Sequence, residues 1–171
     1  MFRKDLKETE YHSYHKTYLD LAPELTLLEA LKHSEEEVLN FITSVPIEKH
    51  AYSYAPGKWN LKEIFSHIID TERIFVYRAL RIARMDESSL LGYDHEEFVK
   101  TSGAASRSTE SLIQEYEAQR SSTIIFFKNL EEEMLLKIGK ANEQSLSPRA
   151  IAFILCGHEK HHLNVFEERY T

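Results

Sequence analysis

The sequence predicts an all-α protein, a four-helix bundle with a long crossover connection. Apolar residues recur at helical spacing through most of the 171 residues, and the chain contains only five glycines and four prolines. Both features are typical of a compact helical domain rather than of a disordered chain. A chain of this length buries roughly two thirds of its unfolded surface, which is enough for one core without disulfides. We therefore treat residues 1–171 as a single domain.

Four main helices are expected from the periodicity and from capping residues. In chain order they run over 23–45, about 60–85, 108–130, and from 148 nearly to the end. Asn60 and Ser108 are suited to the N-cap position, and Glu63 completes a capping box with Asn60. Ser147 and Pro148 combine a cap with a first-turn proline at the start of the last helix.

The connections between these helices differ in length. Residues 46–59 form a long loop with a Pro-Gly turn, and residues 86–107 form a longer connection with a short helix near 94–99. A connection of that length lets the bundle cross over rather than run strictly up and down. Residues 1–22 are polar and carry three tyrosines, and we expect them to form an arm that packs on the bundle.

Charge and composition exclude several classes of partner. The chain has 28 acidic and 21 basic side chains, a net charge of −7, so its surface should repel a phosphate backbone and no nucleic-acid partner is expected. No stretch reaches the ~20 apolar residues that cross a bilayer, so no membrane insertion is expected. A lone cysteine, Cys156, and a charged N-terminal segment indicate a cytoplasmic protein.

Two histidines on the last helix indicate a metal site. His158 and His162 lie one turn apart in the middle of the helix's apolar stripe. Two neutral imidazoles facing a core would need several hydrogen-bond partners, and two charged ones would repel each other. A bound metal removes both problems. The alternative is a pair of core histidines satisfied by other groups.

A third ligand must come from another helix, and His67, on the flank of the second helix's apolar stripe, is the natural donor. Three imidazoles without a fourth protein ligand leave positions for water or substrate, as in catalytic sites. His67 is otherwise an interhelical histidine bonded to a carbonyl. Two residues remain open as contributors: Glu35 as a fourth ligand, proton acceptor or snorkelling carboxylate, and His161 as a ligand or as a group that orients one.

Other candidates are assigned structural roles. Cys156 lies off the stripe and is interpreted as a small buried hydrophobe, and Trp59 as a hydrophobic staple or pocket wall. Glu72, Arg73 and Arg78 could place charges near the site, but a charged helix face is usually solvated, and we interpret them in that way. Five histidines in polar contexts are expected at the surface: His12, His15, His33, His50 and His95.

Several of these residues match a known family. The run from Pro56 to Asn60 (PGKWN) is followed by Glu63, His67, Asp70, Glu72-Arg73 and Tyr77-Arg78, and the chain closes with Gly157-His158-Glu159 and His161-His162. In this combination, which extends over nearly the whole chain, the sequence resembles the DinB/YfiT-like superfamily. The resemblance implies a four-helix bundle, often dimeric, that holds nickel or zinc through one histidine of the second helix and two of the last. By position these are His67, His158 and His162, and a homodimer is possible.

The resemblance also implies a class of chemistry. Relatives include thiol-dependent transferases and isomerases that use bacillithiol or mycothiol, although no thiol-cofactor motif is recognisable here. The leading hypothesis is a metal-dependent transferase or hydrolase acting on a small molecule, with a low-molecular-weight thiol as possible co-substrate. Zinc, nickel and iron all suit three nitrogen ligands with water. The alternatives are a non-catalytic metal-binding or interaction module, and a metal-free bundle with core histidines.

Overall fold

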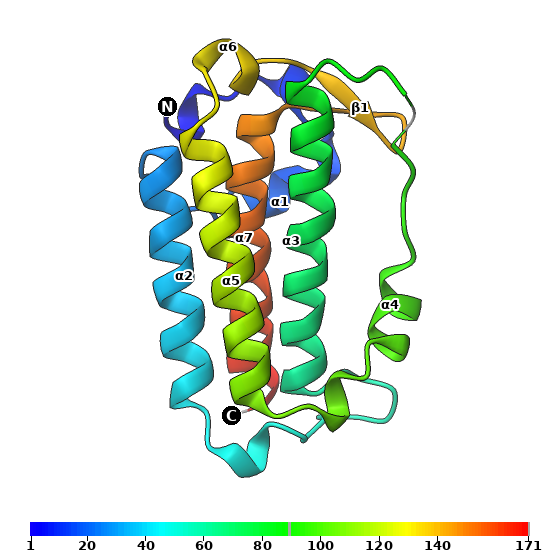
Figure 1. The fold of residues 1–171 in the computed structure, drawn as a ribbon. Coiled ribbons are helices and arrows are strands. Elements are labelled where there is room, and N and C mark those ends of the chain that lie inside the picture. Colours follow the sequence, from blue (N-terminus) through cyan, green and yellow to red (C-terminus); the bar gives the residue numbers. More distant parts are fainter. Residues whose placement is uncertain (89, 171) are drawn as a thin grey trace.

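The computed structural model describes residues 1–88 and 90–170, and in this part of the chain four long helices pack side by side (Figure 1). They are α2 (Leu27–Ser44), α3 (Leu61–Ala83), α5 (Thr109–Lys128) and α7 (Pro148–Tyr170). Helices α2 and α7 run in one direction, and α3 and α5 run in the other. Each of α2 and α3 packs on both α5 and α7. The predicted all-α four-helix bundle is confirmed.

The shorter elements decorate the ends and one side of this bundle. They are α1 (Lys16–Leu19), α4 (His95–Thr101), α6 (Glu132–Leu135), the antiparallel strands β1 (Gly139–Ala141) and β2 (Gln144–Leu146), and single 3₁₀ turns at Arg3–Asp5, Glu8–Glu10, Ser13–His15, Ile47–Lys49 and Ala104–Ser106. The connection from α3 to α5 carries α4 and runs from one end of the bundle to the other (Figure 1). The expected crossover and its short helix are therefore present.

Three of the four long helices begin where the sequence places their caps. The Asn60 side chain accepts a hydrogen bond from the Glu63 N–H at 3.1 Å, and the Glu63 carboxylate accepts one from the Asn60 N–H at 2.8 Å. The hydroxyls of Ser108 and Ser147 each accept a bond from the N–H three residues on, at 3.1 Å. These bonds satisfy donors that the first turn leaves unpaired.

The first long helix starts later than predicted, at Leu27 rather than at Pro23. Thr26 is the residue before it, and its N–H donates to the Glu29 carboxylate at 3.1 Å. A capping residue with a glutamate three positions on specifies a start more strongly than a proline alone, because it satisfies backbone donors.

The hairpin of β1 and β2 was not predicted. Its two-residue turn is Asn142-Glu143, with φ values of 51° and 61°. Positive φ at both positions is typical of a type I′ turn, for which Asn-Gly is the usual sequence signal. Glutamate rarely adopts this conformation, so the turn is invisible in the sequence.

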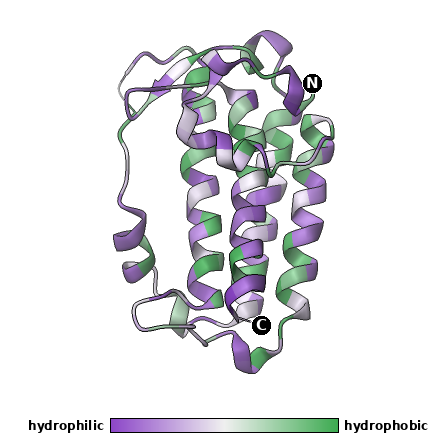
Figure 2. Cartoon of the chain, turned by 180° about the vertical axis from the view of Figure 1, so that it is seen from behind, coloured by the Kyte–Doolittle hydropathy of each residue, from purple (hydrophilic) through white to green (hydrophobic). Residues whose placement is uncertain are grey.

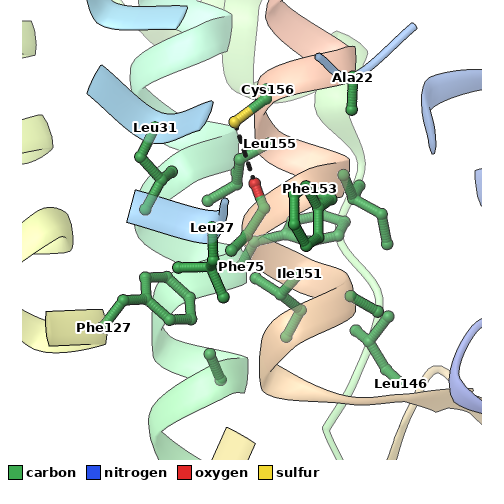
Figure 3. Close-up of a cluster of buried hydrophobic side chains, with 14 of the residues drawn as sticks. Ala22, Leu27, Leu31, Phe75, Phe127, Leu146, Ile151, Phe153, Leu155 and Cys156 are labelled. Carbon is green, nitrogen blue, oxygen red and sulfur yellow. Dashed lines mark hydrogen bonds between the residues drawn. The ribbon is translucent and has the colours of Figure 1, made fainter. Parts of the chain in front are cut away.

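The core lies between the four long helices. Leu31 from α2, Phe75 from α3, Phe127 from α5 and Ile151 from α7 point toward one another in its upper part (Figure 3). Helices α2 and α3 also carry hydrophilic residues among their hydrophobic ones (Figure 2). No helix in the described part of the chain is long and apolar enough to span a bilayer.

The N-terminal arm is fixed to α7 at two points. The Glu10 carboxylate is buried and accepts hydrogen bonds from the Arg149 guanidinium, including one at 2.7 Å, and from the Ser147 hydroxyl at 2.9 Å. Further along, the backbone of Tyr18 crosses α7 so closely that a Cβ on Gly157 would lie 1.7 Å from the Tyr18 carbonyl oxygen. This approach brings the arm within reach of the histidines on α7.

Candidate metal centre

The three histidines that the sequence groups together meet in space. His67 projects from α3, and His158 and His162 project from α7, which packs against α3. The Nε2 atom of His158 lies 3.1 Å from Nε2 of His67 and 3.1 Å from Nε2 of His162. One nitrogen from each residue falls within 4.8 Å of the other two. His67 and His158 are buried and His162 is partly buried.

Burial keeps these imidazoles neutral. Desolvation lowers the pKa of His67 to about 4 and that of His162 to about 3. Desolvation, reinforced by the neighbouring imidazoles, holds the pKa of His158 well below its usual range. Each ring therefore has an unprotonated nitrogen at neutral pH, which is the form that binds a metal.

Hydrogen bonds alone satisfy this arrangement poorly. The Nε2 atom of a neutral imidazole either donates one proton or offers one lone pair. His158 Nε2 contacts two other Nε2 atoms, but it has only one proton to donate or one lone pair to offer. It can therefore form a good hydrogen bond with only one of the two.

A metal ion satisfies all three nitrogens together. With a metal–nitrogen distance of about 2.05 Å and ligand angles of about 90–109°, neighbouring nitrogens lie roughly 2.9–3.4 Å apart. The two 3.1 Å separations fall in this range. The donor set therefore fits a divalent ion with nitrogen affinity, such as zinc or nickel.

The histidines face a cavity of about 590 Å³. Its walls come from α3, α7, the N-terminal arm, the crossover connection and the hairpin. A volume of this size is typical of small-molecule sites. The three nitrogens are therefore accessible to a ligand from one side.

Trp59 forms one wall of the cavity beside the histidines, which is one of the two roles predicted for it. Its ring centroid lies 4.9 Å from that of His67 and 6.5 Å from that of His162, with the latter pair stacked. Tyr18 also packs on the histidines, with ring centroids 5.3 Å from His158 and 5.6 Å from His161. Desolvation raises the pKa of Tyr18 well above its usual value, so its hydroxyl stays protonated.

The two residues left open in the sequence lie outside the convergent group. His161 is partly buried and lines the cavity next to His162, at a ring-centroid distance of 5.2 Å. Glu35 is partly buried on α2, and burial raises its pKa while the charge of Arg120 opposes this shift. Among the described residues, only His67, His158 and His162 form such a group, so Glu35 as a fourth ligand is not supported.

The prediction that Glu72 and Arg78 lie on a solvated face was wrong, and only Arg73 is exposed there. The Glu72 side chain is 1% exposed and accepts hydrogen bonds from Arg120 at 2.8 and 3.2 Å. Arg78 lines the cavity. The burial of Glu72 depends on Arg120, which lies on α5, 48 residues away in the sequence, so no local pattern predicts it.

A buried polar network ties all four long helices together beside the histidines. Arg120 on α5 also pairs with Glu159 on α7, which follows His158 directly. Glu159 accepts further bonds from Tyr116 on α5 at 3.0 Å and from Ser34 on α2. Desolvation alone would lower the pKa of Arg120, but Glu159 and Glu72 outweigh it and raise that pKa well above its usual value. The network fixes the positions of the helices around the histidines.

Of the five histidines expected at the surface, His12, His33 and His95 are exposed as predicted, whereas His50 and His15 are not. His50 is buried, where its ring contacts the Thr109 hydroxyl at 2.7 Å and the Val45 carbonyl at 2.8 Å. His15 is partly buried and lines the cavity. His95, on α4, is exposed at the cavity wall, with its ring centroid 5.8 Å from that of His67.

Cys156 is a small buried hydrophobe, as predicted. Its thiol donates a hydrogen bond to the Ala152 carbonyl at 3.3 Å (Figure 3). Burial raises the pKa of this thiol to about 12, so it is not a nucleophile at neutral pH.

The fold and these side chains define a class of protein, a crossover four-helix bundle with three converging histidines at a cavity. Within that class the chain belongs to the DinB superfamily, whose family model matches residues 30–166. The resemblance stated from the sequence is thereby confirmed.

The solved structure of YfiT from Bacillus subtilis is similar, with a TM-score of 0.73 over 83% of this chain and 82% of that one. That protein is described as a probable metal-dependent hydrolase with an unusual four-helix bundle topology. The two sequences are 10% identical, so the likeness concerns the fold. A search of curated proteins found no match.

Proposed function

We propose that the protein is a metal-dependent enzyme in which His67, His158 and His162 hold one divalent ion. The reaction is attack of water or a small thiol on a small-molecule electrophile. The observation that carries this proposal is the 3.1 Å convergence of neutral imidazole nitrogens beside a cavity of about 590 Å³. The description of YfiT as a probable metal-dependent hydrolase supports the same class of function.

An open site favours catalysis over a purely structural role. Structural zinc sites are closed by four protein ligands, whereas three leave a coordination position free. A bound ion supplies a nucleophile near neutral pH by lowering the pKa of the water or thiol that it binds. Zinc and nickel both suit the three nitrogens, and a thiol co-substrate would favour zinc as the softer choice.

The side chains around the histidines shape the reaction space. Trp59 lies against His67 and His162 and offers an apolar surface to a bound substrate. The Tyr18 hydroxyl, protonated at neutral pH, is available to donate a hydrogen bond to a bound electrophile. These two residues orient the substrate, and the histidines hold the metal.

Cobalt substitution tests whether the site is open. In the cobalt-loaded protein, a small thiol should add sulfur-to-metal charge-transfer absorption, because a coordinated thiol is deprotonated by the ion. His67→Ala should lose both the cobalt and this absorption, while His33→Ala, on the exposed face of α2, should behave as wild type.

The same experiment separates the possible outcomes. A cobalt spectrum that responds to neither thiol nor azide would mean a closed site and would remove the enzyme proposal. If a thiol enters and a panel of electrophiles is consumed only in its presence, the reaction is a thiol transfer. If electrophiles are consumed in water alone, it is a hydrolysis.

A further inference from the structure

Arg78 is a buried cation without a protein counter-ion. The residue is 8% exposed, and its Nη2 donates a hydrogen bond to the Leu91 carbonyl at 3.0 Å. The guanidinium lies over the Phe75 ring at 5.0 Å and near the Tyr93 ring at 6.0 Å. Within the described residues, no carboxylate lies at ion-pair distance from it.

The other buried arginines of the described chain each form an ion pair with a carboxylate. Arg120 pairs with two carboxylates, and Arg149 pairs with Glu10. An uncompensated buried charge is costly, and proteins usually pair it. Arg78 therefore retains guanidinium donors that no side chain of the described residues uses.

The surroundings of Arg78 reinforce this imbalance. Arg78 lines the same cavity as the three converging histidines. In total, seven of the chain's nine histidines line this cavity, the three converging ones included. Among the described residues, no aspartate or glutamate lines the cavity, although the chain carries a net charge of −7.

His15 adds a second unused polar group in the same place. Its Nδ1 atom is buried without a hydrogen-bond partner among the described residues. Its ring stands edge-on to Phe75 at 5.9 Å, on the ring that Arg78 also covers. The part of the cavity around Phe75 thus combines a cation with an unpaired imidazole nitrogen.

We propose that this part of the cavity is an anion subsite, in which Arg78, assisted by His15, binds a carboxylate or phosphate at one end of the substrate. Arg78 lies eleven residues after His67 on α3, which places both on the same side of the helix about 16 Å apart along its axis. Helical side chains all lean toward the N-terminus of their helix, so the arginine and histidine side chains are displaced in the same direction and stay separated along the axis. The substrate is therefore an extended small molecule, anionic at the end remote from the reacting group.

This inference rests on the proposed function for the reacting end of the substrate, whereas the anion subsite itself needs no metal. The test uses calorimetric titration with hexanoate, hexyl phosphate and hexanol, which share one chain and differ in the head group. Wild-type protein should bind at least one of the two anions about tenfold to a hundredfold more tightly than hexanol, with or without zinc. The stronger anion identifies the oxoanion that the subsite prefers.

Variants assign the preference to Arg78. Arg78→Gln should bind all three probes with similar affinity, and Arg78→Lys should retain part of the preference. Arg73→Gln is the matched control, because Arg73 lies on the same helix but pairs with Asp70 and Glu115 outside the cavity. Wild-type protein itself gives a second readout: hexanoate, but not hexanol, should protect Arg78 from phenylglyoxal, as measured by peptide mass spectrometry.

The outcomes distinguish this proposal from the enzyme proposal. A preference for anions that survives in Arg78→Gln and vanishes when zinc is removed would make the metal the anion receptor and overturn the subsite, while supporting metal binding. Equal binding of all probes by the wild type, or no protection of Arg78, would also overturn it. A preference that depends on Arg78 in a protein that takes up no metal would support the subsite and defeat the enzyme proposal.

Discussion

Replacing Arg120 with methionine should strongly destabilise the bundle. Arg120 is fully buried and donates to Glu72, to Glu159 and, at 3.2 Å, to the Leu31 carbonyl. Methionine keeps the apolar stem but leaves two buried carboxylates without a counter-ion. Breaking a buried ion pair in this way costs about 3–5 kcal/mol. For a domain of this size, the melting temperature should fall by roughly 6–20 °C.

The loss should also depend on pH. Burial raises the pKa of Glu159, and Arg120 offsets part of that shift. A carboxyl whose folded pKa lies above its unfolded value stabilises the fold at low pH, and this contribution is lost as pH rises through the folded pKa. Without the guanidinium the folded pKa rises further. The deficit of the variant relative to wild type should therefore be largest near pH 8 and shrink toward pH 5.

Urea denaturation followed by circular dichroism at pH 5, 7 and 8, with chelator present, measures both effects. Arg73→Met is the control, since its partly exposed ion pairs with Asp70 and Glu115 should contribute less than about 1 kcal/mol. The reasoning is refuted if Arg120→Met is no less stable than Arg73→Met, or if its deficit grows toward pH 5.

Three further predictions concern the arm and the metal. Gly157→Ala should cost about 1–3 kcal/mol and speed proteolysis of residues 1–22, because the new Cβ would lie 1.7 Å from the Tyr18 oxygen; unchanged protease resistance would contradict this. Zinc affinity, measured by competition titration, should stay nearly level from about pH 8 to pH 5 and weaken below, because burial lowers the pKa of His67 to about 4 and of His162 to about 3. A fall centred near pH 6.5 would instead indicate solvated imidazoles. Free zinc at about 100 times its dissociation constant should stabilise the fold by about 2.7 kcal/mol, and an unchanged melting temperature would exclude binding to the folded state.

Most of the fold follows from local signals in the sequence. Asn60 with Glu63, Ser108, and Ser147 before Pro148 mark helix starts because each satisfies backbone donors within one turn. The β1–β2 hairpin was not predicted because its turn places a glutamate at positive φ, where the usual sequence signal is absent. The start of α2 moved because a capping pair competes with a proline three residues earlier.

Some residues of the candidate site could be predicted from local spacing, and others are placed there only by the tertiary fold. His158 and His162 share one helix, so their spacing alone places them together, and His67 needed only the packing of α3 on α7. The roles of His15 and His95 depend on how the arm and the crossover fold back onto the bundle, which no local pattern records. Arg78 was predicted to be a surface charge because its burial comes from the crossover connection, where it bonds to the Leu91 carbonyl.

Counting metal ions per chain tests the central claim that His67, His158 and His162 hold one divalent ion. Wild type, His158→Ala and His161→Ala would each be stripped with chelator, loaded with excess zinc, dialysed and measured by elemental analysis, with circular dichroism to verify helicity. We expect about one zinc per chain in wild type and in His161→Ala, and none in His158→Ala. A zinc content unaffected by His158→Ala, or lost equally in His161→Ala, would contradict the assignment.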